Sequence, residues 1–361
     1  MNRIIFGGAF DPVHDGHINM AEKAAKQLAG EVIFVPARIS VWKDSSAPTE
    51  DKIAMLKLAI KDHKEFSIDE FEINSGKDFN YSIDTAKYFR EKYPNDKLFY
   101  LIGTDQVNKF HRWKDCEELA SIVQMVYFGR PEHDPDVDNV SRFHMLHIKG
   151  KEMKVDSTEI RKLRSHNVPD EVLFYIIEKE IYDGVVELKS MLTPHRYAHV
   201  KSVAKLAYEI AKANKLENPL DIYMAALLHD VGKDIPEDKQ KELTKKYYPE
   251  YENMPAYSLH QFAGAALAKE MFNIQNKDLL EAIEFHCTGN ENMSLPAKII
   301  YAADKIEPTR GFDSSDLISA MMNDAEKGFL IVLEANKEFL SSKDKSTNNP
   351  LTYKCFNFYL K

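Results

Sequence analysis

The sequence predicts two domains of different class, a mainly parallel α/β domain over residues 1–185 and an all-α domain over residues 190–361. Short apolar runs alternate with amphipathic segments in the first part, which is typical of α/β folds. After Gly184 the short runs disappear and helical periodicity takes over. A length of 361 residues allows each domain to bury its own core.

The order of elements in the first domain is the one that right-handed βαβ crossovers produce. Strands are predicted over residues 3–8, 31–37, 66–73, 98–103 and 121–131, and helices over residues 17–29, 49–62 and 81–94. Ligands of such sheets bind beyond the carboxyl ends of the strands. Gly7–Gly8, Gly103–Asp105 and Gly129–Arg130 each follow a strand, so we expect them to converge there.

The second domain shows apolar residues at helical spacing only. A Thr-Pro helix-start signal stands at residues 193–194. Helices are predicted over residues 193–214, 219–230, 258–272, 278–286 and 295–306.

Composition limits the partners and the compartment. The net charge of −9 comes without a basic block, so nucleic acid is not an expected partner. No apolar run is long enough to span a membrane or to serve as a signal peptide. Three widely spaced cysteines do not suggest a disulfide framework. We therefore expect a cytoplasmic protein, and the sequence makes no prediction of its oligomeric state.

The stretch GGAFDPVHDGH, at residues 7–17, predicts a phosphate site. Glycines permit a sharp turn after the first strand, and the helix that follows directs free N–H groups at the turn. His14 and His17 can donate hydrogen bonds to phosphate oxygens as charge builds up in a transition state. No carboxylate cluster accompanies them, which argues against a metal site. The plainer alternative is a tight turn with two surface histidines.

This stretch resembles the (H/T)xGH signature of the nucleotidyltransferase superfamily. More closely, it resembles the opening of bacterial nicotinate-nucleotide adenylyltransferases, which form deamido-NAD and pyrophosphate from ATP and nicotinate mononucleotide. NYSIDTAKYF, LIGTDQVNKFHRWKD and VDSTEIRKL are similar to three further motifs of that family, with Ser82 and Asp156 as departures. The resemblance covers about 180 residues and implies a Rossmann-like nucleotidyltransferase fold.

The resemblance also implies residue roles. The phosphates would be aligned and neutralised, with Mg²⁺ bridging the phosphates of ATP, by His14, His17, Lys43 and Arg161. ATP would be bound by Gly8, Ala9, Phe10, Gly103, Asp105, Arg130, Ser157 and Thr158. Trp113 would stack on the pyridine ring, and the backbone N–H of Thr85 would receive the nicotinate carboxylate. An amide acceptor, nicotinamide mononucleotide, is the alternative.

Six further residues predict a metal centre in the helical domain. They lie on five predicted helices: His199, His229, Asp230, His260, His286 and Asp304. A single histidine on an apolar helix is more often a core residue, but six ligand-type residues favour a metal site. Imidazole suits Fe, Mn, Zn and Ni, and a carboxylate can bridge two cations. Two metals sharing Asp230 would activate a water molecule and bind a phosphoryl group.

The order of these residues resembles that of the HD-domain phosphohydrolases. PHRYAHVKSVA, LLHDVGK, HQFAG, HCTGNENM and ADKIEPTR resemble motifs of bacterial HD enzymes that split diadenosine tetraphosphate (Ap4A) symmetrically into two ADP. The resemblance implies that the six residues hold a dinuclear centre, of iron or alternatively manganese. Lys233 would neutralise the attacked phosphate, and Arg196, Gly264 and Arg310 would bind the nucleotide. The alternatives are a non-catalytic nucleotide sensor and hydrolysis of another phosphoester.

Overall fold

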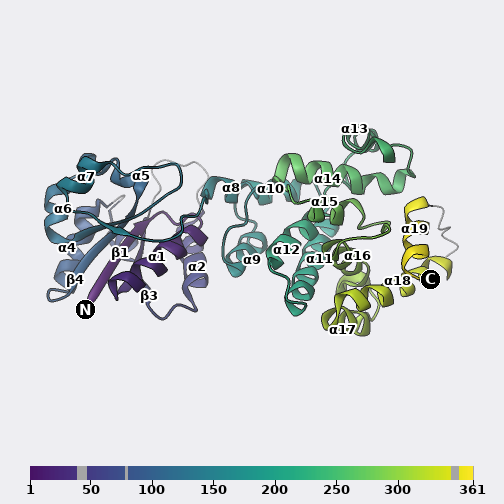
Figure 1. Cartoon of the computed structure of the whole chain (residues 1–361), viewed down its shortest axis with the longest axis horizontal. Coiled ribbons are helices and arrows are strands. Elements are labelled where there is room, and N and C mark those ends of the chain that lie inside the picture. Colours follow the sequence, from purple (N-terminus) through teal and green to yellow (C-terminus); the bar gives the residue numbers. More distant parts are fainter. Residues whose placement is uncertain (39–46, 78–79, 343–348, 361) are drawn as a thin grey trace. The chain divides into compact units, whose positions relative to one another are not determined.

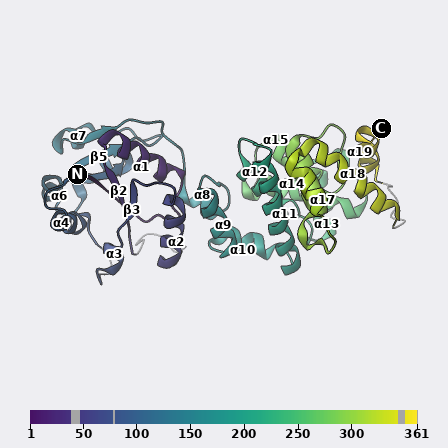
Figure 2. The same cartoon turned by 90° about the horizontal axis from the view of Figure 1, so that it is seen from below.

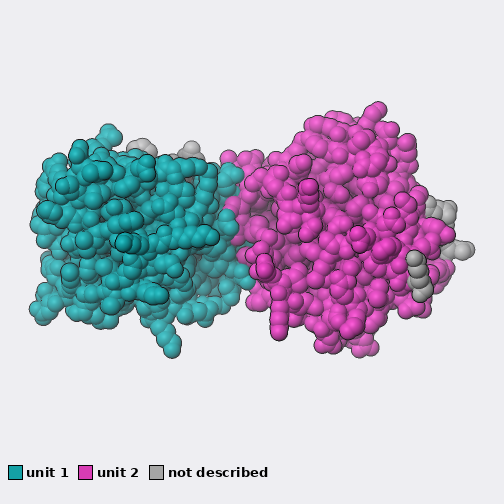
Figure 3. Space-filling model, in the orientation of Figure 1, with its two compact units in different colours: residues 1–161, 167–183 teal, residues 162–166, 184–361 magenta. Residues whose placement is uncertain are grey.

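The computed structural model describes residues 1–38, 47–77, 80–342 and 349–360, which form two compact units. The first unit comprises residues 1–161 and 167–183, and the second comprises residues 162–166 and 184–361 (Figure 3). Lys43, which we expected to contact phosphates, lies outside the described residues. No helix among the described residues is both long and apolar enough to cross a lipid bilayer.

The first unit is built on a six-stranded sheet in which every pairing is parallel, in the order β3-β2-β1-β4-β5-β6 (Figure 1). The strands are β1 (Asn2–Gly8), β2 (Glu31–Pro36), β3 (Phe66–Ile68), β4 (Lys97–Gly103), β5 (Gln124–Phe128) and β6 (Leu146–Ile148). The prediction of a mainly parallel sheet is therefore confirmed.

Helices connect the strands of this unit. They are α1 (Asp15–Leu28), α2 (Thr49–Ile60), α3 (Phe71–Asn74), α4 (Ser82–Lys92), α5 (Thr104–Val107), α6 (Cys116–Ile122), α7 (Val137–Arg142), α8 (Ser157–Arg161) and α9 (Asp170–Glu178), with a 3₁₀ turn η1 (Phe110–Arg112). Successive residues of β1 face opposite layers, because side chains alternate along a strand. Ile5 belongs to the same apolar cluster as Phe89 of α4, whereas the ring of Phe6 contacts Phe10 and Phe34.

One strand prediction is wrong in its second half. We expected a strand over residues 66–73, but β3 ends at Ile68 and Phe71–Asn74 form a helical turn. The side chain of Asp69 accepts the backbone N–H of Phe71 at 2.9 Å. Such an aspartate turn offers the backbone a local partner and so competes with strand pairing.

The second unit contains helices and no strand among its described residues, as Figures 1 and 2 show from two sides. The α-helices are α10 (Asp183–Ser190), α11 (Pro194–Ala213), α12 (Pro219–Leu228), α13 (Glu237–Tyr247), α14 (Leu259–Phe272), α15 (Lys277–Glu284), α16 (Leu295–Ile306), α17 (Ser315–Asn323), α18 (Ala325–Ser342) and α19 (Pro350–Tyr359). Three 3₁₀ turns separate some of them: η2 (Pro249–Tyr251), η3 (Ala256–Ser258) and η4 (Pro308–Arg310). The all-helical prediction is confirmed.

The predicted helix start at Thr193-Pro194 is present. The hydroxyl of Thr193 accepts the backbone N–H of Arg196 at 3.4 Å, and Pro194 occupies the first helical position. These features stabilise the start of α11, whose neighbours are α12 and α16. The helix therefore has a fixed end near His199.

In the first unit, the hydroxyl of Thr104 joins the carboxyl ends of β4 and β5. It donates to the carbonyl oxygen of Phe128 at 3.0 Å and accepts the N–H of Arg130 at 3.0 Å, and the side chain is fully buried. We expect Thr104→Val to lower the free energy of unfolding by about 1–3 kcal/mol, because it leaves two backbone groups unpaired. Tryptophan fluorescence during urea unfolding measures this, since both tryptophans, Trp42 and Trp113, belong to the first domain of the sequence.

Thr104→Ser is the matched control, because it keeps the hydroxyl and removes only a methyl group. A valine variant as stable as the serine variant would contradict the assigned role of these hydrogen bonds.

Two candidate active sites

The first candidate site is a cavity of about 300 Å³ at the carboxyl edge of the sheet. Six residues of the predicted site line it: Gly8, His17, Gly103, Asp105, Trp113 and Arg130. The expected convergence of the glycine turns after β1 and β4 is therefore confirmed. Gly7 also approaches another part of the wall closely, since a Cβ atom there would lie 2.8 Å from the hydroxyl of Tyr100.

His14 and His17 form a reciprocal cap at the start of α1. The Nδ1 atom of each ring accepts the backbone N–H of the other residue at 3.3 Å, and the rings stack with centroids 3.6 Å apart. Because Nδ1 is an acceptor in both rings, a neutral imidazole here carries its hydrogen on Nε2. Burial, together with nearby His14 and Arg130, holds the pKa of His17 well below its usual value. His17 is therefore a neutral Nε2–H donor at pH 7.

Arg130 and Asp105 form an ion pair beside Gly103, with 3.0 Å between Arg130 Nη1 and Asp105 Oδ1. Both side chains are partly exposed and line the cavity. A Cβ atom at Gly103 would lie 2.7 Å from the Asp105 carboxylate, so glycine gives this pair the room it needs. One cation and one carboxylate thus stand next to the histidine pair.

The cavity is also lined by Trp113 and by a polar group of residues: Glu72, Asn80, Ser82 and Tyr100. Glu72 accepts the hydroxyl hydrogen of Thr85 at 2.6 Å. Burial raises the pKa of the Glu72 carboxyl. These residues combine an aromatic surface with neutral donors and one carboxyl group.

The structure corrects the expectation for Thr85. Its side chain is fully buried, and its backbone N–H donates to the carbonyl oxygen of Tyr81 at 3.3 Å within α4. The N–H that we expected to receive a carboxylate is therefore already used by the helix. Thr85 is connected to the cavity through the hydrogen bond that its hydroxyl donates to Glu72.

Several other predicted site residues do not line this cavity. Phe10 is 1% exposed, and its ring packs against Phe6, Phe34 and His17. Arg161 is buried and donates to the backbone oxygen of Asp11 at 2.8 Å. The remaining ones stand elsewhere: Ala9 next to Gly8 in the turn, and Ser157 and Thr158 at the start of α8.

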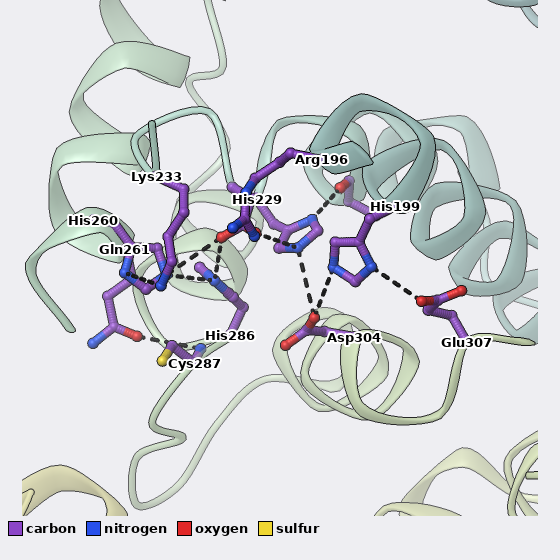
Figure 4. A network of polar contacts seen from close by, with 12 residues as sticks. Arg196, His199, His229, Lys233, His260, Gln261, His286, Cys287, Asp304 and Glu307 are labelled. Carbon is purple, nitrogen blue, oxygen red and sulfur yellow. Dashed lines mark hydrogen bonds and ion pairs between the residues drawn. The ribbon is translucent and has the colours of Figure 1, made fainter. Parts of the chain in front are cut away.

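The second candidate site is a group of buried histidines and aspartates (Figure 4). Three histidines share one local geometry: His229, His260 and His286. In each, Nδ1 lies next to the carbonyl oxygen of the residue three positions earlier, at 2.6, 2.9 and 2.8 Å respectively. A carbonyl only accepts, so Nδ1 carries the hydrogen and Nε2 presents a lone pair.

These lone pairs converge on Asp230. The Nε2 atoms of His260 and His286 each lie 3.3 Å from Asp230 Oδ1 and 3.2 Å from one another. The Nε2 atom of His229 is buried and has no hydrogen-bond partner among the described residues. Converging lone pairs around an ionised carboxylate fit a metal cation.

Two ligand clusters share this carboxylate. One comprises His199, His229 and Asp230, and the other comprises Asp230, His260 and His286. Asp304 adjoins the first cluster, since its Oδ1 lies 3.1 Å from His199 Nε2 and 3.8 Å from His229 Nε2. The structure thus brings together all six residues that the sequence singled out as ligands.

His199 is oriented by a carboxylate that the sequence analysis missed. Glu307 is 1% exposed, and its Oε1 lies 3.1 Å from His199 Nδ1. The same side chain also accepts hydrogen bonds from Ser202 and Thr309. A carboxylate behind a ligand histidine fixes the orientation of the ring. The sequence signal was its position three residues after Asp304.

Four cationic side chains line the cavity around this cluster, which has a volume of about 930 Å³. They are Arg196, Lys233, Lys305 and Arg310. Arg196 Nη1 lies 2.5 Å from Asp230 Oδ2, and Arg310 Nη2 lies 2.5 Å from Asp304 Oδ1. Lys233 Nζ lies 3.2 Å from His260 Nδ1. Positive charge beside a metal cluster suits a ligand with several phosphates.

Gly264 is one of the residues that we expected to bind the nucleotide. This residue is buried, and it does not line the cavity. A Cβ atom there would lie 3.4 Å from the backbone nitrogen of Gly232 and from the carbonyl oxygen of His229. At Gly232, by contrast, a Cβ atom would lie 2.4 Å from the carbonyl oxygen of His260 and 2.6 Å from the backbone nitrogen of Gly264, so Gly232 allows α14 to approach the His-Asp turn closely.

Gln261 is a second supporting residue that the sequence analysis missed. It is fully buried, and its side-chain oxygen accepts the N–H groups of Cys287 and Thr288 at 3.3 Å. It thereby holds the loop that follows His286. Its position next to a predicted ligand was the only available signal.

The comparisons with known proteins match both units. Residues 5–163 match the cytidylyltransferase-like family model, and residues 196–309 match the HD-domain model. A Mycoplasma genitalium protein named probable nicotinate-nucleotide adenylyltransferase/Ap4A hydrolase is 30% identical over 342 residues, which cover 92% of this chain and 96% of that protein. A Mycoplasma pneumoniae protein of the same name is 30% identical over 92% of this chain and 98% of its own length.

A third relative matches the first half alone. The nicotinate-nucleotide adenylyltransferase of Bacillus subtilis is 31% identical over 189 residues, which cover 50% of this chain and 97% of that protein.

We expect Glu72→Gln to raise the unfolding temperature of the first unit at pH 7 to 8 but not near pH 4. Because its pKa is raised, folded Glu72 holds its proton more tightly than the unfolded chain does. The stability contributed by this proton is complete at acidic pH and is lost as the pH rises through the raised pKa. A neutral glutamine avoids that loss and still accepts the hydrogen bond from Thr85. Thermal unfolding followed by tryptophan fluorescence measures the difference.

Asp62→Asn, at an exposed position, is the control and should not change the pH dependence. A glutamine variant with the wild-type profile at every pH would contradict a raised pKa.

We expect Glu307→Gln to weaken metal binding by the second unit about 10–100-fold, the usual effect of losing such an orienting carboxylate. Metal content after dialysis against graded chelator concentrations measures the affinity. Glu338→Gln changes an exposed glutamate of α18 and should leave the affinity unchanged. An unchanged affinity in Glu307→Gln would show that Glu307 does not position His199.

Proposed function

This chain belongs to the family of bifunctional nicotinate-nucleotide adenylyltransferase/Ap4A hydrolases, and we propose that it carries out both reactions. Residues 1–185 would transfer AMP from ATP to nicotinate mononucleotide, and residues 190–361 would hydrolyse Ap4A. The observation that carries the proposal is a match over 92% of the chain to bifunctional relatives, joined to an intact set of six buried ligand residues.

Adenylyl transfer requires alignment and charge neutralisation and no covalent protein nucleophile. A phosphate oxygen of nicotinate mononucleotide bonds to the α-phosphorus of ATP, and the bond from that phosphorus to the α,β-bridging oxygen breaks. The Nε2–H groups of His14 and His17 would donate to the reacting phosphate, as their Nδ1 hydrogen bonds support. Arg130 would add positive charge. Mg²⁺ would enter with ATP and neutralise the departing pyrophosphate.

The pyridine ring of the acceptor would stack on Trp113, the large aromatic side chain of the cavity. Nicotinamide mononucleotide is the alternative acceptor, and one observation favours it. Glu72 lines the cavity, and a carboxylate accepts an amide N–H but repels a second carboxylate. An assay in which the two mononucleotides compete for limiting ATP decides which acceptor the protein uses. Membership of the family predicts that it uses nicotinate mononucleotide.

In the second unit, the ligands of a dinuclear centre would be His199, His229, Asp230, His260, His286 and Asp304. When bound, the two metal ions supply an activated water and neutralise charge on the attacked phosphoryl group. Iron, with manganese as the alternative, follows from the resemblance to HD enzymes. Lys233, Arg196 and Arg310 would bind the phosphate chain, as their places around the cavity support.

We place cleavage at the centre of the phosphate chain. The oxygen of water bonds to the second phosphorus, and the bond from that phosphorus to the oxygen shared with the third phosphorus breaks. The leaving oxygen takes up a proton, so that both products are ADP. This symmetrical outcome distinguishes the proposal from hydrolysis near one end, which gives ATP and AMP.

The two reactions should respond to different substitutions. Purified full-length protein, loaded with iron or manganese, is given Ap4A, and the products are separated by chromatography. We expect ADP alone, lost in Asp230→Ala and unchanged in His17→Ala. With ATP and nicotinate mononucleotide, His17→Ala should form deamido-NAD about 10²–10³-fold more slowly, because a transition-state donor is removed. Asp230→Ala should retain this activity.

ATP together with AMP would refute symmetrical cleavage. No turnover of Ap4A with either metal, in protein that still binds ADP, would favour the nucleotide-sensor alternative. Loss of both activities in His17→Ala would contradict the assignment of separate sites.

A further inference from the structure

The turn between β1 and α1, which carries His14, is hydrogen-bonded to residues at the end of the first unit. Arg161 donates to the backbone oxygen of Asp11 at 2.8 Å, although 150 positions separate the two residues in the chain. Tyr182, the last residue but one of the unit, donates its hydroxyl hydrogen to Asp11 Oδ1 at 2.8 Å. Unlike Arg161, Tyr182 is not among the site residues that the sequence predicts.

The carboxylate of Asp11 is buried inside this turn. It is 4% exposed, and its Oδ1 also accepts the N–H of Ala47 at 3.1 Å. Its Oδ2 is buried and has no hydrogen-bond partner among the described residues. A buried carboxylate is costly unless it is hydrogen-bonded, so the donors to Oδ1 decide where this side chain lies. Tyr182 is the only side chain that donates to the carboxylate in the part of the chain that the structure describes.

The backbone of Tyr182 is strained. Its φ is +73°, in the left-handed region that bulky residues rarely adopt. The side chain is 7% exposed, and burial together with the Asp11 carboxylate raises the pKa of the hydroxyl, which therefore keeps its hydrogen and donates it. Strained residues persist where the surrounding contacts over-determine them, and they gather at functional sites. The strain is thus a second observation, independent of the hydrogen bond, that this tyrosine is held in place for a reason.

The position of Asp11 bears directly on the histidine donors. His14 follows three residues later, is 3% exposed and caps α1. At the first residue of α1, the N–H of Asp15 donates to the backbone oxygen of Asn167 at 3.1 Å. The chain before and after His14 is therefore fixed by residues from the end of the unit. Such support matters, because a misplacement of about 1 Å can slow a reaction about 100-fold.

We propose that Tyr182 is a positioning residue for adenylyl transfer, which holds the carboxylate of Asp11 and thereby the Nε2–H groups of the two histidines. Tyr182 does not line the cavity at the carboxyl edge of the sheet, so its hydroxyl acts through Asp11 and not on the substrate. Groups that bind a transition state need such supporting hydrogen bonds to keep their geometry. This inference rests on the proposed adenylyltransferase function.

Tyr182→Phe tests the role, because it removes the hydroxyl and keeps the ring. Full-length protein is given ATP and nicotinate mononucleotide, and kcat and KM for deamido-NAD formation are measured separately. We expect kcat to fall about tenfold or more, with KM for both substrates unchanged, because the histidine donors act in the transition state.

Tyr175→Phe is the matched control. Tyr175 lies on α9, and its hydroxyl donates to Asp51 Oδ1 at 2.7 Å. This substitution also removes one hydrogen bond from a tyrosine to an aspartate, but Asp51 lies on α2 and not in the turn. We expect kcat to stay at the wild-type value. Unfolding temperatures, measured in parallel, show that both variants are folded.

A double variant tests whether the hydroxyl acts through the carboxylate. Asp11→Ala removes the acceptor, so adding Tyr182→Phe should not slow the reaction further. A double variant slower than Asp11→Ala alone would show that Tyr182 acts by another route and would overturn the proposal. So would an unchanged kcat in Tyr182→Phe, a rise in KM alone, or an equal loss of kcat in Tyr175→Phe.

NMR signals of the histidine rings provide a readout that does not depend on turnover. The signals of His14 and His17, assigned with single His→Gln variants, should shift in Tyr182→Phe and stay in place in Tyr175→Phe. Unchanged signals in Tyr182→Phe would refute the positioning role. If wild type forms no deamido-NAD but the signals respond as expected, the adenylyltransferase function is refuted, whereas Tyr182 still positions the histidine pair.

Discussion

The hydrogen bond that histidine Nδ1 makes with the backbone decides the chemistry of both sites. In the first unit, Nδ1 of His14 and His17 accepts backbone N–H groups, which leaves Nε2–H as a donor to phosphate. In the second unit, Nδ1 of His229 and two further histidines faces backbone carbonyls, which leaves Nε2 as a lone pair for a cation. The same side chain serves opposite purposes because the backbone fixes its tautomer.

The charged side chains around these histidines differ between the two units. The first site has an ion pair, Arg130 with Asp105, and a carboxyl group in Glu72 whose burial opposes its ionisation. The second site surrounds Asp230 and Asp304 with imidazoles and cationic side chains, and both carboxyl pKa values lie well below the usual range despite burial. Buried carboxylates of this kind are costly unless they are paired, which is why the pairing groups are so close.

The second unit also shows how a reactive centre and its surroundings can come from different parts of a chain. The candidate ligands lie on α11, α14 and α16 and in the turns that follow α12 and α15, while residues of α18 and α19 line the same cavity. Close approaches at Gly232 and Gly289 allow these helices to meet. Each of these positions is a place where a side chain would collide with neighbouring backbone or with a cysteine sulfur.

The sequence by itself determined the parallel α/β class of the first unit, the helical class of the second, and the six candidate ligand residues, because hydrophobic periodicity and motif spacing are local properties. It did not reveal that Asp69 ends β3, that the N–H of Thr85 is used within α4, or that Gly232 permits the close approach of α14. Glu307 and Tyr257 acquire their places only when distant elements meet. Tertiary structure decided these features, because hydrogen bonding and burial depend on neighbours that are remote in the chain.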